Sequence, residues 1–244
     1  WMFRCSRLPS YGSLAGEAKN PPMTVAAMRP SRKELHPHVR AELQEAGAVA
    51  ALSDRQGEEL VKRMTVEGQK AFQHWCKVWE PQSYSGFCGP ASALAALRFF
   101  GLEDSWTQHR IYDEVVCPKQ LFTRGISFAN GVIMLKSLCA GRLEVLERSS
   151  FDEVEIAEQL LKDLADAFEQ GEQICILVNY IRLGSGHWSP LAGWSNGHVL
   201  IMDTNQQRLP PYWVPLDTLV ESLCRYNRTT QRPRGYVVLR APKV

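Results

Sequence analysis

The sequence predicts an α+β fold in which a mostly helical first half is followed by an antiparallel β-sheet. Three observations support this prediction. Apolar residues recur at spacings of three or four over residues 39–79, and residues 90–100 consist largely of good helix formers. Strand-like runs separated by Gly, Asn and Pro then follow residue 170.

The first forty residues are expected to form an irregular extension. They contain five prolines with little periodicity, at positions 9, 21, 22, 30 and 37. They are also poor in acids and rich in Arg, Ser and Pro, as in a disordered tail or the end of a transit peptide. We therefore assign residues 1–40 to an extension and residues 41–244 to a single domain.

The helical half is predicted in two parts on either side of a loop. Residues 39–79 fit amphipathic helices, which Pro81 ends before a loop over residues 82–86. The next helix covers residues 90–100 and stops at Gly101, so that Cys88 lies at or just before its first turn. A further helix is expected over residues 152–170.

Four strands are predicted in the second half. Their expected ranges are residues 173–181, 188–194, 198–203 and 235–239. His187 directly precedes the second of these strands, and Asp203 ends the third.

Composition excludes several classes of partner. The net charge of +2 comes from nearly balanced acids and bases, so we expect neither a nucleic-acid partner nor an anionic membrane. No apolar run reaches the length of about 18 residues that a membrane-spanning helix needs. Seven widely spaced cysteines without a CxxC pair fit a reducing compartment and predict no metal site. We expect a soluble, cytoplasmic protein, with import into a plastid or other organelle left open.

Cys88 is the candidate nucleophile. The backbone N–H groups and positive dipole at a helix N-terminus stabilise a thiolate. Gln82, six residues earlier, could donate its amide N–H to the oxyanion formed when the thiolate attacks a carbonyl. The alternative is that Cys88 is simply a small core residue.

His187 and Asp203 are the candidate base and its orienting acid. Glycines on both sides of the strand that bears His187, in the segment from Gly184 to Gly193, leave room for a substrate backbone beside the ring, and imidazole suits proton transfer near neutral pH. A carboxylate at the end of an apolar strand could fix the ring tautomer. A hydrogen-bonded structural histidine is the alternative for His187, and we interpret His198 as structural.

The order of these motifs resembles that of the phytochelatin synthase family over residues 82–239. After Gln82, Cys88-Gly, Gly-His187-x-Ser-Pro and Asp203 come Pro210-Pro-Tyr-Trp-Val-Pro-Leu216 and Arg234-Gly-Tyr. Gly125-Ile-Ser-Phe128 also resembles a family segment. The resemblance implies a papain-like cysteine protease fold, with a helical part that carries the nucleophile packed on an antiparallel sheet that carries the histidine and aspartate.

The resemblance also implies an activity, that of a γ-glutamylcysteine dipeptidyl transpeptidase. Cys88 would cleave the Cys-Gly bond of glutathione, release glycine and pass γ-Glu-Cys to glutathione, phytochelatin or water. His187 would act as base, Asp203 would orient it, and Gln82 would complete the oxyanion hole.

The substrate-binding residues expected from the resemblance are Gly186, Arg182, Arg208, Asn227 and Arg234. Two positions depart from the family pattern. Asn227 stands where members often carry an Asp for the γ-glutamyl amine, and Gln206 replaces a basic residue, with Arg208 two positions further on. An uncharged amide binds an ammonium more weakly than a carboxylate does.

No tightly bound cofactor is expected. Heavy-metal ions such as Cd, Zn and Cu would arrive as glutathione thiolate complexes. Glutathione and phytochelatin peptides are the expected partners, and a homodimer is possible. Two alternatives stay open: a papain-like peptidase for peptides ending in small residues, and an idle thiol- or metal-binding module that uses Cys88, Cys117 and Cys139.

Overall fold

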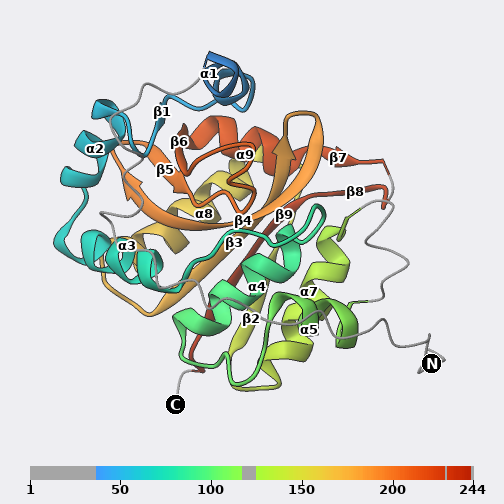
Figure 1. The fold of residues 1–244 in the computed structure, drawn as a ribbon. Coiled ribbons are helices and arrows are strands. Elements are labelled where there is room, and N and C mark those ends of the chain that lie inside the picture. Colours follow the sequence, from blue (N-terminus) through green and yellow to red (C-terminus); the bar gives the residue numbers. More distant parts are fainter. Residues whose placement is uncertain (1–36, 117–124, 229, 243–244) are drawn as a thin grey trace.

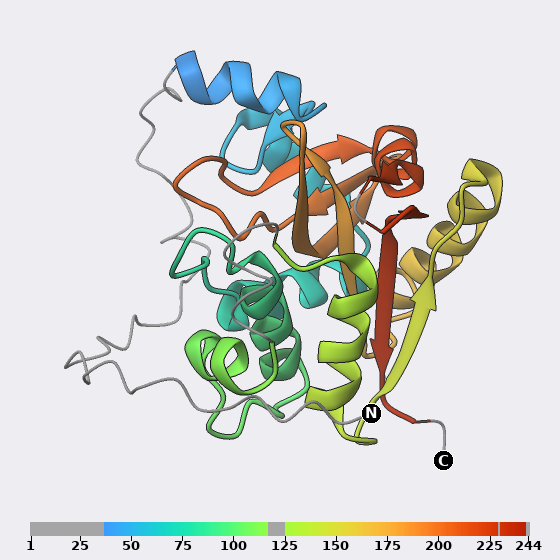
Figure 2. The same ribbon diagram turned by 90° about the vertical axis from the view of Figure 1, so that its right-hand side faces the viewer.

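A computed structural model describes residues 37–116, 125–228 and 230–242. Helices cover both faces of a large central sheet (Figures 1 and 2). The described helices are α1 (Pro37–Glu45), α2 (Arg55–Lys62), α3 (Val66–Val78), α4 (Cys88–Phe99), α5 (Gln108–Glu114), α7 (Phe128–Cys139), α8 (Glu153–Phe168) and α9 (Leu216–Cys224). The described strands are β1 (Ala50–Ala51), β2 (Glu144–Arg148), β3 (Ile174–Arg182), β4 (Ser185–Ser195), β5 (His198–Ile201), β6 (Tyr212–Pro215), β7 (Tyr226–Asn227), β8 (Arg232–Pro233) and β9 (Gly235–Arg240).

Seven of the described strands form an antiparallel sheet with the order β1-β6-β5-β4-β3-β9-β2. Its middle is the β3–β4 hairpin, in which Arg182 pairs with Ser185 and Tyr180 with His187. The turn of this hairpin uses Leu183 and Gly184, both at positive φ, as a two-residue type I′ turn requires. The short β7–β8 hairpin pairs separately and leads directly into β9.

Two apolar clusters lie on opposite faces of the sheet. One joins α3, α4 and α7 to the sheet, and the other joins α8 and α9 to it. Nearly every residue of α4 is buried, and this explains why its sequence is apolar all round. The helix that begins with Cys88 is therefore fixed in the centre of the domain.

The predicted α+β class is confirmed, and the main helices and strands lie close to their expected ranges. The helix predicted over residues 90–100 is α4, with Cys88 as its first residue. The strand predicted over residues 188–194 is longer, because β4 starts at Ser185 and includes His187. The strand predicted over residues 198–203 ends at Ile201, so Asp203 lies in the loop beyond it.

Some described elements depart from the predicted order of helices followed by strands. β1 interrupts the first helical stretch and pairs with β6, and β2 precedes α8 and pairs with β9. α1 begins at Pro37, slightly before the predicted domain boundary at residue 41. The rest of the predicted extension, residues 1–36, lies outside the described residues.

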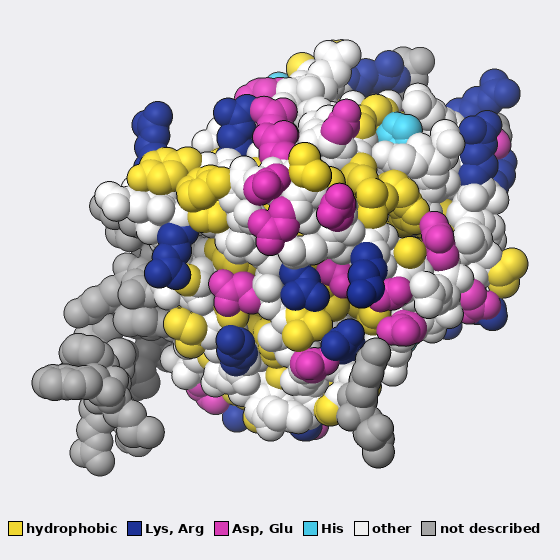
Figure 3. All heavy atoms as spheres, turned by 180° about the vertical axis from the view of Figure 1, so that it is seen from behind, with side chains coloured by type: hydrophobic (Ala, Val, Ile, Leu, Met, Phe, Trp, Pro, Cys, Tyr) yellow, Lys and Arg dark blue, Asp and Glu magenta, His cyan; other side chains and the backbone are white. Residues whose placement is uncertain are grey.

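Charges of both signs alternate over the rear surface, with apolar groups between them (Figure 3). This mixture agrees with the near-neutral net charge of the chain. Among the helices of the described residues, none is long and apolar enough to cross a bilayer.

Trp188, the residue after His187, packs tightly against α7. Its ring stacks on Phe128 with centroids 5.8 Å apart, and its Nε1 donates to the Ile126 carbonyl at 3.1 Å. A Cβ placed on Gly131 would lie 2.2 Å from Cζ2 of this ring. Glycine is therefore needed at this point of α7 for the indole to lie against the helix.

We expect Gly131→Ala to lower the free energy of unfolding by about 1 to 3 kcal/mol, because the clash outweighs the helix propensity that alanine adds. Urea denaturation measures the change. Ser137→Ala, at an exposed position of the same helix, is the control and should be neutral or slightly stabilising. Equal behaviour of the two variants would contradict the packing described for Trp188.

Candidate active site

Three separate segments of the chain meet at one site: the start of α4, the β3–β4 hairpin and the loop after β5. Two hydrogen bonds tie the segment before α4 to the loop after β5. Trp79 Nε1 donates to the Met202 carbonyl at 3.2 Å, and the Gln82 N–H donates to the Thr204 carbonyl at 2.7 Å. The chain segment that leads into α4 and Cys88 therefore lies beside the loop that carries Asp203.

Cys88 is held as a nucleophile at the N-terminus of α4. Phe87, the N-cap residue, makes no side-chain cap, so the first N–H groups of the helix stay available. Burial alone would raise the pKa of the Cys88 thiol. Its hydrogen bond to His187, the charge of that ring, and the N–H groups of Trp188 and Gly89 outweigh burial, so its pKa is lowered.

His187 connects the sulfur to a buried carboxylate. Its Nε2 lies 3.0 Å from Asp203 Oδ1, which also accepts a 2.8 Å hydrogen bond from the Asn205 N–H. With Nε2 held in this way, Nδ1 is the nitrogen left for Cys88. Burial lowers the pKa of His187, but the charge and hydrogen bond of Asp203 and the contact with Cys88 raise it to about 9.

A lowered pKa of the Cys88 thiol beside a raised pKa of the His187 ring favours a thiolate–imidazolium pair, with the two groups titrating together. We expect iodoacetamide to alkylate Cys88 readily at pH 7 and the reaction to continue above pH 9, because alkylation needs only the thiolate. In His187→Ala, the hydrogen bond and charge of the ring no longer offset the effect of burial, so the pKa of the Cys88 thiol rises. Alkylation at pH 7 should then slow by about tenfold or more.

The measurement is the rate of Cys88 alkylation against pH, followed by mass spectrometry. His198→Ala is the matched control, because the His198 ring is tied to the Asn196 carbonyl at 2.7 Å on an exposed turn. An unchanged pH profile in His187→Ala would contradict the ion pair.

Arg182 lies against the His187–Asp203 pair. Its Nε is 3.4 Å from Asp203 Oδ2, and its Nη2 is 3.5 Å from His187 Nδ1. The side chain is almost fully buried, and Arg182 Nε and Nη1 and Asp203 Oδ2 have no hydrogen-bond partner. The guanidinium thus acts on Asp203 as a charge at close range, in a geometry too poor for a hydrogen bond.

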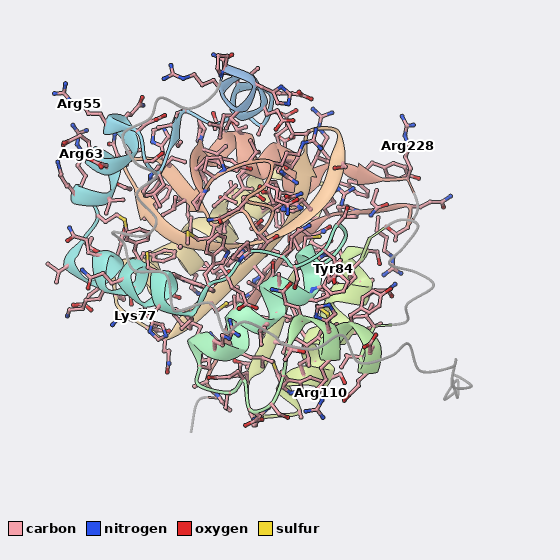
Figure 4. The ribbon with its side chains drawn as sticks, in the orientation of Figure 1. Arg55, Arg63, Lys77, Tyr84, Arg110 and Arg228 are labelled. Atoms are coloured by element: carbon pink, nitrogen blue, oxygen red, sulfur yellow. The ribbon has the colours of Figure 1, made fainter. Side chains whose placement is uncertain are left out.

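Gln82 is held close to the same pair. Its Oε1 accepts from Thr204 Oγ1 at 3.3 Å, and Thr204 Oγ1 lies 3.5 Å from His187 Nε2. Gln82 Nε2 donates to the Tyr84 carbonyl at 2.9 Å, which uses one of its two hydrogens. The second hydrogen is the one that could reach an oxyanion. Figure 4 shows Tyr84 in the loop that leads into α4.

Arg234 and Gly186 lie together beside His187. A Cβ on Gly186 would stand 2.4 Å from Arg234 Nη1, so the guanidinium rests directly on this glycine. Arg234 Nη1 also donates to Asn179 Oδ1 at 3.2 Å, and Asn179 Nδ2 donates to the His187 carbonyl at 3.3 Å. Arg234 Nε is buried without a hydrogen-bond partner, so the guanidinium keeps donor capacity that the described residues do not use.

The other two predicted substrate-binding residues, Arg208 and Asn227, have no described contact with Cys88, His187 or Asp203. Arg208 is exposed and its Nε pairs with Glu42 of α1 at 3.0 Å. Asn227 is buried in the β7–β8 hairpin opposite Arg232. The neighbouring Arg228 projects away from this hairpin (Figure 4). The roles of Arg208 and Asn227 in binding remain predictions.

Sequence reasoning missed Asn179 and Thr204. Asn179 is a polar residue inside an otherwise apolar strand, a pattern that indicates a specific hydrogen-bonding role. Thr204 directly follows Asp203 but carries no spacing signal.

Among the described residues, no group of three His, Cys, Asp or Glu side chains could hold a metal ion. Of the cysteines in the alternative metal-binding interpretation, Cys117 lies outside the described residues, as does Arg124 in the family-like segment before Phe128. Cys139 is buried in the core, and burial raises the pKa of its thiol to about 11, which disfavours a thiolate ligand.

Comparison with known proteins relates the site to a family. The model described as Phytochelatin synthase matches residues 40–236. The chain is 25% identical over 207 residues to glutathione gamma-glutamylcysteinyltransferase 3 of Lotus japonicus, which covers 75% of this chain and 42% of the relative. It is 24% identical over 199 residues to glutathione gamma-glutamylcysteinyltransferase 1 of Arabidopsis thaliana, covering 75% and 39% of the two chains. The chain thus spans less than half the length of these relatives.

Among solved structures, the peptidase domain of Streptococcus ComA, a bifunctional ABC transporter, matches with a TM-score of 0.44 and 15% identity. The match covers 67% of this chain and 97% of that domain.

Proposed function

Because this chain belongs to the phytochelatin synthase family, we propose that it cleaves glutathione at the Cys-Gly bond and transfers the γ-Glu-Cys group. The observation that carries the proposal is the Cys88–His187–Asp203 arrangement, in which a thiol with a lowered pKa meets a ring with a raised one. Such a pair suits acyl transfer, since it supplies a nucleophile and a proton donor together.

In the first half-reaction the Cys88 thiolate attacks the carbonyl of the Cys-Gly bond. The oxyanion that forms receives hydrogen bonds from the Cys88 N–H and the free hydrogen of Gln82 Nε2. The C–N bond then breaks, and the imidazolium of His187 gives its proton to the departing glycine nitrogen. A thioester remains on Cys88.

In the second half-reaction the neutral His187 takes a proton from the acceptor as that acceptor attacks the thioester. An amine of a second glutathione gives a lengthened γ-Glu-Cys peptide, and water gives free γ-Glu-Cys. Heavy-metal ions belong to the substrate here, carried on the sulfur of glutathione, for which soft metals have high affinity. A reducing compartment such as the cytoplasm suits this thiol chemistry, and the described cysteines are all free.

We expect Arg234 to bind a carboxylate of glutathione through the guanidinium atoms that face away from Asn179. Arg234→Met should raise KM for glutathione about 10- to 100-fold with a smaller change in kcat, as the loss of a charge-assisted hydrogen bond predicts. Steady-state glycine release measures both constants.

Arg240→Met is the matched control, because Arg240 lies at the far end of β9, the strand that follows Arg234, and pairs with the partly exposed Glu144. A kcat loss in Arg234→Met without a change in KM would contradict the binding role.

Mass spectrometry of the protein mixed with glutathione tests the proposal directly. We expect a mass increase of one γ-Glu-Cys unit on the peptide that contains Cys88, together with release of glycine. Peptides that end in Gly-Gly form the comparison arm. Acylation by those peptides but not by glutathione would overturn the proposal in favour of a peptidase.

A further inference from the structure

The loop that carries Gln82 is held in place by one buried side chain, Gln108, at the first position of α5. Its Oε1 accepts hydrogen bonds from the backbone N–H and the hydroxyl of Ser83, both at 2.9 Å. Its Nε2 donates to Glu80 Oε1 at 2.8 Å and to the Pro81 carbonyl at 2.9 Å. Gln108 therefore contacts the residues on both sides of Gln82.

The Gln108 side chain uses all of its hydrogen-bonding capacity on residues of this loop. Gln108 is 4% exposed, and its four contacts use both amide hydrogens and both lone pairs of the carbonyl oxygen. A fully satisfied buried amide of this kind holds its neighbours in one arrangement. The precision with which residues 80–83 are placed therefore depends on α5.

The same network reaches the helix of the nucleophile. Glu80 also forms a 2.7 Å ion pair with Arg98 in the last turn of α4. α5 lies alongside α4 (Figures 1 and 2). The loop is thus anchored to α4 through Arg98 at its start and through Cys88 at its end.

On the other side, Gln82 is held by Thr204, which accepts from its N–H and donates to its Oε1. The loop is therefore held by Gln108 of α5 on one side and by Thr204, after β5, on the other. Gln82 lies between these two contacts. A shift of about 1 Å in the position of an oxyanion donor is enough to remove a large part of its contribution to the reaction rate.

We propose that Gln108 is a positioning residue for acyl transfer, which acts by fixing the loop so that the Gln82 amide is aimed at the oxyanion. This proposal rests on the proposed function for its natural substrate. The positioning role itself applies to any acyl donor that Cys88 attacks.

The test is a double-mutant cycle between Gln108→Met and Gln82→Ala, with the rate of Cys88 acylation as the readout. We measure it by glycine release from glutathione in a single turnover and by p-nitrophenol release from p-nitrophenyl acetate. Gln108→Met should slow acylation about tenfold in the wild-type background. In the Gln82→Ala background the same change should cost less than about twofold, because residues that act as one unit are not additive.

Two further measurements separate positioning from a general loss of structure. Alkylation of Cys88 by iodoacetamide forms no oxyanion, so its rate should stay within about twofold in Gln108→Met. Gln69→Met is the matched control, since Gln69 ties the α2–α3 connection through bonds to the Lys62 and Met64 carbonyls. It should lose stability without slowing acylation.

Ser83→Ala supplies a milder variant in case Gln108→Met folds poorly. It removes one of the four bonds at an exposed residue and should slow acylation a few-fold, again only when Gln82 is present. An undiminished effect of Gln108→Met or Ser83→Ala in the Gln82→Ala background would overturn the proposal. Acylation by the ester but not by glutathione would remove glutathione as substrate, and the cycle with the ester would still decide the role of Gln108.

Discussion

Cys88→Ser is expected to reduce glycine release from glutathione by about 10⁴-fold or more, because loss of a nucleophile disables the whole catalytic unit. A serine hydroxyl at this position would have a pKa far above that of the thiol. The features that favour the thiolate, the helix N-terminus and the ring of His187, could not ionise it.

Glycine release under saturating glutathione is the measurement, and loss of the acyl adduct on residue 88 should accompany it. Cys224→Ser is the matched control, since Cys224 is also a buried free thiol but lies at the end of α9. Undiminished glycine release by Cys88→Ser would remove the acyl-enzyme mechanism altogether.

Asp203→Asn is expected to lower kcat by about 10⁴-fold, through the wrong histidine tautomer. The cause is Arg182, which has donors only and lies 3.4 Å from Asp203 Oδ2. Two donors compete for the oxygen of the new amide: the Asn205 N–H, whose hydrogen bond Asp203 Oδ1 accepts at 2.8 Å, and the charged guanidinium. We expect the charge to prevail, so that the oxygen turns toward Arg182 and the NH₂ toward His187 Nε2. Nε2 would then accept, and the proton would move to Nδ1, the nitrogen that must receive the Cys88 proton.

The same substitution should cost stability. It removes the negative partner of a buried guanidinium, a loss of about 3 to 5 kcal/mol in comparable buried pairs. Urea denaturation of Asp203→Asn measures this cost. Asp163→Asn is the control, because Asp163 is also a buried carboxylate, bonded to the Tyr236 hydroxyl at 2.9 Å, but lies on α8 away from Cys88.

Adding Arg182→Met to Asp203→Asn makes the prediction specific. Without the guanidinium the amide can turn its oxygen back to His187, so kcat should recover at least about tenfold and part of the stability should return. If Arg182→Met instead lowers the activity of Asp203→Asn further, Arg182 acts on the substrate and not on Asp203.

The sequence allowed the reacting residues to be identified because each lies at a recognisable boundary. Cys88 precedes a run of helix formers, His187 lies between glycines and a strand, and Asp203 follows an apolar run. These local patterns predict the boundaries well because helix starts and strand ends are set by nearby residues. The α+β order followed from the same signals.

The supporting residues could not be found in this way, since their roles depend on contacts between distant segments. Arg182 meets Asp203 only because β3, β4 and β5 lie side by side in the sheet, and Gln108 meets Ser83 across 25 residues. β1 has two residues, too few for any periodicity, and exists only because β6 offers it a partner.

The pairing of β1 with β6 also protects the sheet. The segment around β1 donates to the Trp213 and Pro211 carbonyls through the Val49 and Leu52 N–H groups, and so occupies the outer rim of β6. An edge strand with unpaired backbone N–H and C=O groups can pair with strands from other molecules. The short β1 segment therefore protects this edge against self-association. Shortening the chain past residue 52 would expose the edge of β6, two strands from β4, which carries His187.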